Sequence, residues 1–290
     1  KAELVFKEIL DQSSDDMNAL KNLGETYRKM NKPHLAIKYY ELYLAINSND
    51  NEVINNLASC YLKNKRYEQA VNYYRDLTKN NPHDQEYLTN LAMALIESLN
   101  FKEGMQILEQ LLDKNISNKR ALSGYLFNQN YNPQINFDKL NNYIKKFNHS
   151  SKKDNLNIIN FCYKKNPKKI NVGFVSPDFR SHPVGYALTN VIEHLKSYNF
   201  NLFGYYSFSL EDDLTNKFKK DFDHFHNVTD LNDEQIINKI RSDGIHILID
   251  LAGYTFNNRI SIFFNNPAPI QISMLGYLAT TGIKEIKYKI

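Results

Sequence analysis

The sequence predicts a chain in two parts: an array of helical repeats, then an α/β domain with a parallel sheet. Residues align with one another at a spacing of 34 through residues 1–127, which is typical of repeats built from helix pairs. From residue 169 onward, short apolar runs of strand length alternate with helical patterns, which favours parallel strands covered by helices. The 290 residues are enough for two domains, each with its own core.

Charge and cysteine usage narrow the class of protein. The net charge is only +4 and both signs are mixed, so we expect no nucleic-acid partner and no membrane-surface partner. Two cysteines far apart do not form a disulfide framework, which favours a reducing compartment. No apolar run approaches the roughly 20 residues that span a bilayer, and no signal peptide is visible. We therefore expect a cytoplasmic protein.

The repeat has small residues at two fixed places and a leucine before the first of them. Small residues allow the two helices of a hairpin to approach closely, and aromatic residues fill the space between hairpins. This 34-residue pattern resembles tetratricopeptide repeats. We expect the chain to open inside the second helix of a repeat, with three full repeats following and a fourth that decays. The full repeats start at Met17, Asn51 and Gln85, and the fourth starts near Lys119.

One polar column, Asn22, Asn56 and Asn90, occupies the same position in three consecutive repeats. The first helix of each repeat lines the concave face of such a superhelix. An asparagine offers a donor and an acceptor together, so a stack of them can bind an extended peptide backbone without reading side chains. The alternative is solvated surface, because asparagine is abundant here and Gly124 breaks the column. We predict a peptide-binding ladder.

A connector follows at residues 128–168, where the repeat phase is lost. Pro133 and residues 149–153 indicate irregular chain, and Tyr143–Phe147 and Leu156–Tyr163 are short candidate helices.

The α/β domain is predicted over residues 169–290. Its strands are expected at Ile170–Ser176, Asn201–Phe208, His224–Val228, Ile245–Leu251 and Ile270–Leu275, with helices at residues 184–197, 213–220, 234–242 and 257–264. In parallel sheets, ligands bind beyond the carboxyl ends of the strands. Three polar phrases follow predicted strands, at that edge: Asp178–Pro183, Asp250–Thr255 and Gly276–Gly282.

The residue types in these phrases suit a site. Pro183 fits the first position of a helix, which places His182 at the cap, beside free backbone N–H groups that can bind a phosphate or sugar oxygen. Asp250 ends a buried strand, so its carboxylate must be hydrogen-bonded or must face the cleft. The alternative to a site role is structural in each case. His182 would then only cap the helix, and the residues after Asp250 would form an ordinary turn at the end of a strand.

The order of these phrases behind a repeat array resembles the O-linked N-acetylglucosamine transferase and SPINDLY family, glycosyltransferase family 41. The resemblance implies a tetratricopeptide-repeat superhelix followed by one Rossmann-like lobe of a GT-B glycosyltransferase. It also implies an inverting, metal-independent enzyme that transfers a sugar, expected to be N-acetylglucosamine, from a UDP-sugar to Ser or Thr of polypeptides. No cofactor is expected beyond that donor substrate.

The resemblance also assigns roles. It makes His182 the catalytic residue, against the sugar and the acceptor hydroxyl, and it makes the asparagine column the ladder that binds acceptor polypeptides. The sugar and acceptor cleft then comprises Pro183, Asp250, Gly253, Tyr254, Thr255, Gly276, Tyr277, Thr280 and Thr281. Two departures stand out: Tyr254 replaces a histidine of many relatives, and Leu278-Ala279 replaces a proline and a small turn residue.

The resemblance leaves the second lobe unread and two alternatives open. The leaving-group lysine and most uridine contacts belong to a second lobe expected after Ile290, so we expect the full-length protein to be active and these 290 residues alone to be inactive. A non-enzymatic peptide-binding adaptor with a degenerate lobe is one alternative, and a relative that uses fucose or glucose is another.

His224 and His226 share a strand face without a third ligand nearby, so no metal site is expected.

Overall fold

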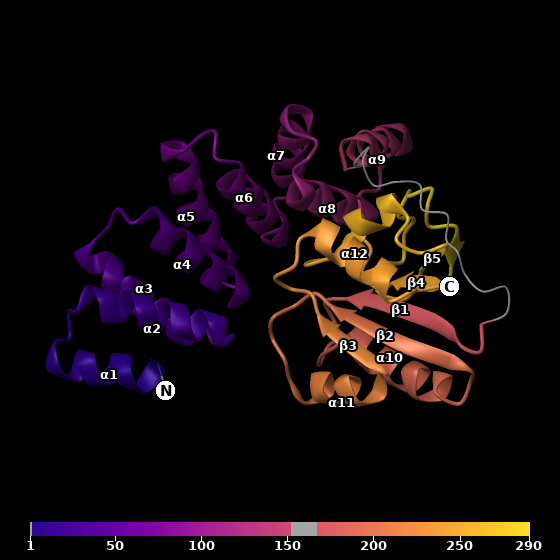
Figure 1. Cartoon of the computed structure of the whole chain (residues 1–290). Helices are drawn as coiled ribbons and strands as arrows, with labels where there is room; N and C mark the ends of the chain where they lie inside the picture. Colours follow the sequence, from indigo (N-terminus) through magenta and orange to yellow (C-terminus); the bar gives the residue numbers. More distant parts are fainter. Residues whose placement is uncertain (1, 152–166) are drawn as a thin grey trace. The chain divides into compact units, whose positions relative to one another are not determined.

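The computed structural model describes residues 2–151 and 167–290 and divides into two compact units, Lys1–Ala121 and Leu122–Ile290 (Figure 1). Among the described residues, no helix is long and apolar enough to cross a membrane.

The first unit consists of antiparallel helix pairs. The predicted repeat starts are confirmed, because Met17, Asn51, Gln85 and Lys119 are the first residues of α2, α4, α6 and α8. The helices are α1 (Ala2–Gln12), α2 (Met17–Lys29), α3 (Pro33–Ile46), α4 (Asn51–Lys63), α5 (Tyr67–Asn80), α6 (Gln85–Glu97) and α7 (Phe101–Lys114), and α8 (Lys119–Asn128) continues into the second unit.

A repeated aspartate explains where the first helix of each repeat begins. Asp16, Asp50 and Asp84 are N-caps, and each side chain accepts a hydrogen bond from a backbone N–H of the first helical turn. Such a bond satisfies a donor that the helix itself leaves unpaired, and it contributes about 1 kcal/mol. The sequence analysis did not single out this column, although it has the same 34-residue spacing.

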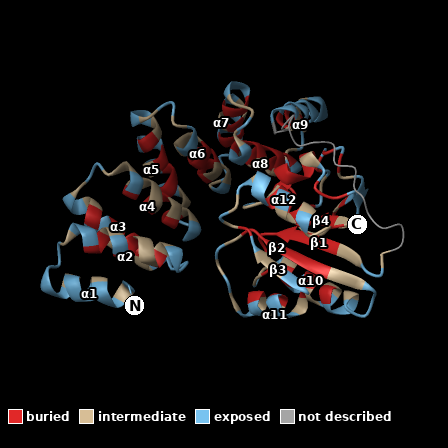
Figure 2. Ribbon diagram, in the orientation of Figure 1, coloured by how far each residue is buried: buried red, intermediate tan, exposed pale blue. Residues whose placement is uncertain are grey.

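The core of the repeat unit follows the predicted logic of small residues against aromatics. A Cβ atom added at Gly24 would lie 2.6 Å from the ring of Tyr40, so the helix pair could not approach as closely with a larger residue. Tyr61 and Tyr73 stack with ring centroids 5.7 Å apart. The buried residues of α2 to α6 belong to one hydrophobic cluster, and buried segments are red in Figure 2.

The second unit begins with helices that pack on the α/β domain. These are the end of α8, the 3-10 helix η1 (Gln129–Tyr131) and α9 (Phe137–Ser151). The rings of Phe147 and Phe264 meet edge to face at 5.5 Å, so α9 shares a core with the domain that follows. The predicted helix Tyr143–Phe147 lies within α9, and the predicted helix Leu156–Tyr163 lies outside the described residues.

The α/β domain is a parallel sheet of six strands in the order β3-β2-β1-β4-β5-β6. The order reverses between β1 and β4, which is the place where doubly wound sheets bind ligands. The five predicted strands are present, and β6 is an addition. The bounds are β1 (Ile170–Ser176), β2 (Phe200–Tyr206), β3 (His224–Asn227), β4 (Ile247–Asp250), β5 (Ile270–Ser273) and β6 (Tyr288–Lys289).

Helices cover both faces of the sheet. Helices α10 (Pro183–Leu195) and α11 (Asp213–Asp221) share one core with the strands, and α12 (Asp233–Ser242) lies at the face that carries Tyr205, whose hydroxyl donates to Asp243 at the end of α12. The predicted helix from Asn257 is wrong: the element there is the 3-10 helix η2 (Ile260–Asn265). The reason is local, since Asn257 has a φ of 57°, which a right-handed helix cannot include.

Candidate functional site

The loops after β1, β4 and β5 meet at the carboxyl edge of the sheet. A Cβ atom added at Gly276 would lie 2.1 Å from the carbonyl oxygen of Leu251 and 3.2 Å from the side chain of Val184. One residue of the last loop therefore contacts both the end of β4 and the first turn of α10. The structure thus brings the three predicted phrases together at the point where the strand order reverses.

His182 is the N-cap of α10, as the sequence predicted. Its backbone is extended, with φ −148° and ψ 149°, and its Nδ1 atom accepts a hydrogen bond from the N–H of Val184 at 3.3 Å. Pro183 occupies the first helical position, where a missing N–H costs nothing. The imidazole is 34% exposed, so it is accessible at the edge of the sheet.

A buried aspartate lies beneath this histidine. The Oδ2 atom of Asp178 is 3.6 Å from Nδ1 of His182, and its Oδ1 atom accepts a hydrogen bond from Arg180 at 3.3 Å. Burial raises the pKa of Asp178, and the charges of His182 and Arg180 oppose that rise. The guanidinium of Arg180 also lies 5.0 Å from the ring centroid of Phe208. Asp178 belongs to the first polar phrase, but no role was predicted for it from the sequence.

The loop that carries His182 is held from two further sides. The backbone N–H of Ser181 donates to Oδ2 of Asp212 at 2.7 Å, which ties the loop to the start of α11. A Cβ atom added at Gly185 would lie 2.2 Å from the carbonyl oxygen of Arg180, so the first turn of α10 packs directly on the loop backbone. These contacts fix the place of the imidazole.

Asp250 faces its own turn. Its carboxylate, 1% exposed, accepts hydrogen bonds from the N–H groups of Ala252 at 3.1 Å and Gly253 at 2.8 Å. Burial raises the pKa of Asp250 to about 6, although both hydrogen bonds oppose the rise. Its carboxylate is therefore used to shape the loop after β4.

Two buried tyrosines pack against each other between the loops after β4 and β5. Tyr254 is 2% exposed and its hydroxyl donates to the carbonyl of Thr281 at 2.7 Å. The ring of Tyr277 packs edge to face on Tyr254 at 5.6 Å, and its hydroxyl lies 3.4 Å from the carbonyl oxygen of Leu126 in α8. Burial raises the pKa of both hydroxyls, so both stay neutral donors.

The threonines of the site differ in exposure. Oγ1 of Thr255 is buried and has no hydrogen-bond partner among the described residues. Thr280 is exposed and accepts from the N–H of Gly282 at 3.1 Å, whereas Thr281 is buried and accepts from the N–H of Ile283 at 3.4 Å. Of the predicted cleft residues, Pro183 and Thr280 are the exposed ones.

The asparagine column lies on the first helices of the repeats, but its members have different surroundings. Asn22 is exposed and its amide donates to the carbonyl of Asn18 at 2.8 Å. Asn56 is half-buried. Asn90 is 6% exposed, and its amide donates to Oδ1 of Asn55 at 2.9 Å. Asn22 and Asn56 are thus the members most open to a bound peptide.

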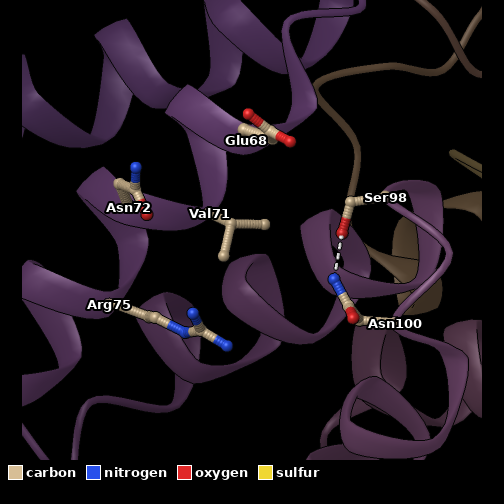
Figure 3. A pocket seen from close by; sticks show the side chains of 6 residues that line it. All are labelled: Glu68, Val71, Asn72, Arg75, Ser98 and Asn100. Carbon is tan, nitrogen blue, oxygen red and sulfur yellow. Dashed lines mark hydrogen bonds between the residues drawn. The ribbon is translucent and has the colours of Figure 1, made fainter.

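Two further features bear on ligand binding. Within residues 2–151 and 167–290, no group of three His, Cys, Asp or Glu side chains is placed to hold a metal ion. A pocket of about 240 Å³ lies in the repeat unit between α5 and the turn after α6, lined by Glu68, Val71, Asn72, Arg75, Ser98 and Asn100 (Figure 3). It is smaller than a typical small-molecule site.

Comparisons with known proteins agree with this geometry. The model of Glycosyl transferase family 41 matches residues 129–290, and that of Anaphase-promoting complex, cyclosome, subunit 3 matches residues 29–111. A mutant of the Thermobaculum terrenum O-GlcNAc transferase has a similar structure, with a TM-score of 0.82 over 94% of this chain and 53% of that chain, at 24% identity. At that identity the likeness shows the fold.

Curated relatives match in sequence as well. A probable UDP-N-acetylglucosamine--peptide N-acetylglucosaminyltransferase SPINDLY of Solanum lycopersicum is 31% identical over 41% of this chain and 13% of its own length. The corresponding protein SEC of Arabidopsis thaliana is 35% identical over 42% of this chain and 12% of its own length. The match therefore spans about an eighth of the length of these relatives.

We expect Gly253→Ala to destabilise the second unit strongly. Gly253 has a φ of 55°, and an added Cβ atom would lie 2.3 Å from Cβ of Tyr277. The matched control is Gly244→Ala, where φ is 62° but the nearest atom is 3.7 Å away. Urea unfolding should show a loss of about 1 kcal/mol for the control and about 3 kcal/mol or more for Gly253→Ala. Equal losses would show that the loop contact is not tight.

The burial of Asp250 predicts a pH dependence of stability. Its folded pKa lies above the value of about 3.9 expected in an unfolded chain. The contribution of protonated Asp250 to the free energy of unfolding is therefore complete below about pH 3.9. It is lost as the pH rises through about 6.

We expect wild type to gain about 1 kcal/mol over Asp250→Asn between about pH 7 and about pH 5, measured by urea unfolding of both proteins at each pH. A difference that does not change with pH would place the carboxylate in contact with water.

Proposed function

This chain belongs to glycosyl transferase family 41, and from that premise we propose that the protein transfers a sugar, N-acetylglucosamine, from a UDP-sugar to Ser or Thr of polypeptides. We further propose that it works in the cytoplasm and needs no metal or cofactor. The proposal concerns the whole protein, since the matched region is a small part of each relative.

One observation carries the proposal: an accessible histidine begins a helix at the reversal point of a 3-2-1-4-5-6 parallel sheet. The positive end of the α10 dipole lies at that place and favours an anion or an oxygen with partial negative charge. A diphosphate sugar presents both. The buried Asp178 and the tethered Ser181 hold the loop, so the imidazole is fixed before a substrate binds.

The reaction that fits is a single displacement. The hydroxyl oxygen of the acceptor attacks the anomeric carbon, the bond from that carbon to the diphosphate oxygen breaks, and its electron pair leaves with UDP. The products are the glycosylated polypeptide, UDP and the hydroxyl proton. His182 would contact the reacting oxygens, at the positive end of the α10 dipole.

The repeat unit supplies the acceptor-binding surface in this proposal. Asn22 and Asn56 lie one repeat apart on α2 and α4, and both side chains are open to solvent at least in part. Amide groups at a regular spacing can bind backbone groups along an extended chain. Such contacts are the same for many acceptor sequences, so the ladder would give affinity with little selectivity.

A specific observation favours a second candidate, a peptide-binding adaptor without activity. Asp250 and Tyr254 are buried and hydrogen-bonded within the loops, and Tyr277 is buried with its hydroxyl beside α8. These members of the predicted cleft therefore hold structure instead of facing a substrate. The two candidates share the repeat surface and differ at His182. A variant at that residue therefore separates them.

We expect His182→Ala to lower sugar transfer to a Ser- or Thr-containing peptide by about 100-fold, because one preorganised polar group at the reacting oxygens contributes about that factor. The matched control is His194→Ala, which removes an exposed histidine from the last turn of the same helix. Radiolabelled sugar transfer by the natural protein measures both. If His182→Ala and His194→Ala retain equal activity, His182 is not in the site; no transfer by wild type favours the adaptor.

The double variant Asn22→Ala and Asn56→Ala should raise the KM for a long polypeptide acceptor several-fold and leave kcat unchanged, because backbone contacts far from the reacting atoms are the same in the ground and transition states. The control is Asn80→Ala, at the exposed end of α5, the second helix of its repeat. A rise in KM of equal size in both proteins would contradict the ladder.

A further inference from the structure

The hydrogen bond at the start of α10 fixes which nitrogen of His182 carries the proton. The backbone N–H of Val184 can only donate, and it points at Nδ1 of His182 from 3.3 Å. Nδ1 must therefore present its lone pair. A neutral imidazole carries one N–H, so that hydrogen is on Nε2.

The buried carboxylate of Asp178 does not change this assignment of the proton to Nε2. In a histidine that acts as a base through Nε2, a carboxylate normally accepts a hydrogen bond from Nδ1–H. Here the Oδ2 atom of Asp178 is 3.6 Å from Nδ1, beyond hydrogen-bond range. Its other oxygen, Oδ1, accepts from Arg180 at 3.3 Å.

The role of His182 as the N-cap of α10 favours the same tautomer. Protonation of Nδ1 would break the cap bond and leave the N–H of Val184 unpaired. A histidine that takes a proton during the reaction would therefore work against its own helix.

We propose that His182 acts as a hydrogen-bond donor through Nε2–H to a substrate oxygen, and not as the base that takes the acceptor proton. This inference rests on the proposed function. The oxygen belongs either to the nucleotide sugar or to the acceptor hydroxyl. In both cases the contribution is electrostatic: no proton changes hands at His182, and the hydroxyl proton leaves by another route.

The first test reads the tautomer directly and needs no catalysis. Long-range ¹H–¹⁵N correlation spectra of the ¹⁵N-histidine-labelled protein, recorded over a pH series, separate the Nε2–H form from the Nδ1–H form at the neutral end of the titration. The signals of His182 are identified by their loss in His182→Asn. We expect the Nε2–H form in wild type and also in Asp178→Asn. An Nδ1–H form in wild type overturns the inference, whatever the activity.

The second test uses two isosteres of different length. In His182→Asn, the amide oxygen takes the place of Nδ1 and keeps the helix cap, but no atom reaches the place of Nε2. In His182→Gln, the amide nitrogen reaches the place of Nε2 and can donate, although it cannot take a proton.

A donor role predicts that His182→Gln keeps transfer within about 10-fold of wild type while His182→Asn loses about 100-fold or more. Equal loss in the two variants indicates a base and overturns the inference. Thermal unfolding of both variants checks that the cap is intact. A raised KM for the UDP-sugar in His182→Asn assigns the oxygen to the donor, and a raised KM for the peptide assigns it to the acceptor. Absence of transfer by wild type rejects the proposed function but leaves the tautomer result valid.

Discussion

The close backbone contact at Gly276 is the constraint on which the candidate site depends. With a Cβ atom 2.1 Å from the carbonyl oxygen of Leu251, no side chain fits there, so the loop after β5 can lie directly on the end of β4. The same residue contacts Val184, which ties both strands to the start of α10. The position of His182 therefore depends on the packing of Gly276 against Leu251 and Val184, a contact that involves no atom of His182.

Periodicity made the fold predictable from sequence, and the reasons are local. A 34-residue repeat fixes the helix starts, and a recurring N-cap such as Asp50 reinforces each one. Apolar runs of strand length predicted the buried strands β1 and β4, because a buried parallel strand needs little beyond its own residues. The error at Asn257 has the opposite cause: its φ of 57° keeps the first residues of a pattern that looked helical out of the helix, and a 3-10 helix begins only at Ile260.

Side-chain roles in the loops were less predictable, because they depend on partners far away in sequence. The hydroxyl of Tyr254 finds the carbonyl of Thr281, and that of Tyr277 lies near the carbonyl of Leu126. Neither partner can be read from the phrase that contains the tyrosine. A motif shared within a family therefore mixes residues that shape the loops, such as Asp250, with residues that reach the substrate side, such as His182.

This mixture bears on how the imidazole could contribute. A hydrogen-bond donor stabilises developing charge most when it does not need to reorient during the reaction. The cap bond from Val184 holds Nδ1, and Pro183 fixes the backbone that follows, so Nε2 projects from a ring anchored at its other nitrogen. The bond that starts the helix thus also sets the direction of the donor. A proton acceptor at the same place would have to give up that bond, so stability of α10 and donor chemistry at His182 favour the same tautomer.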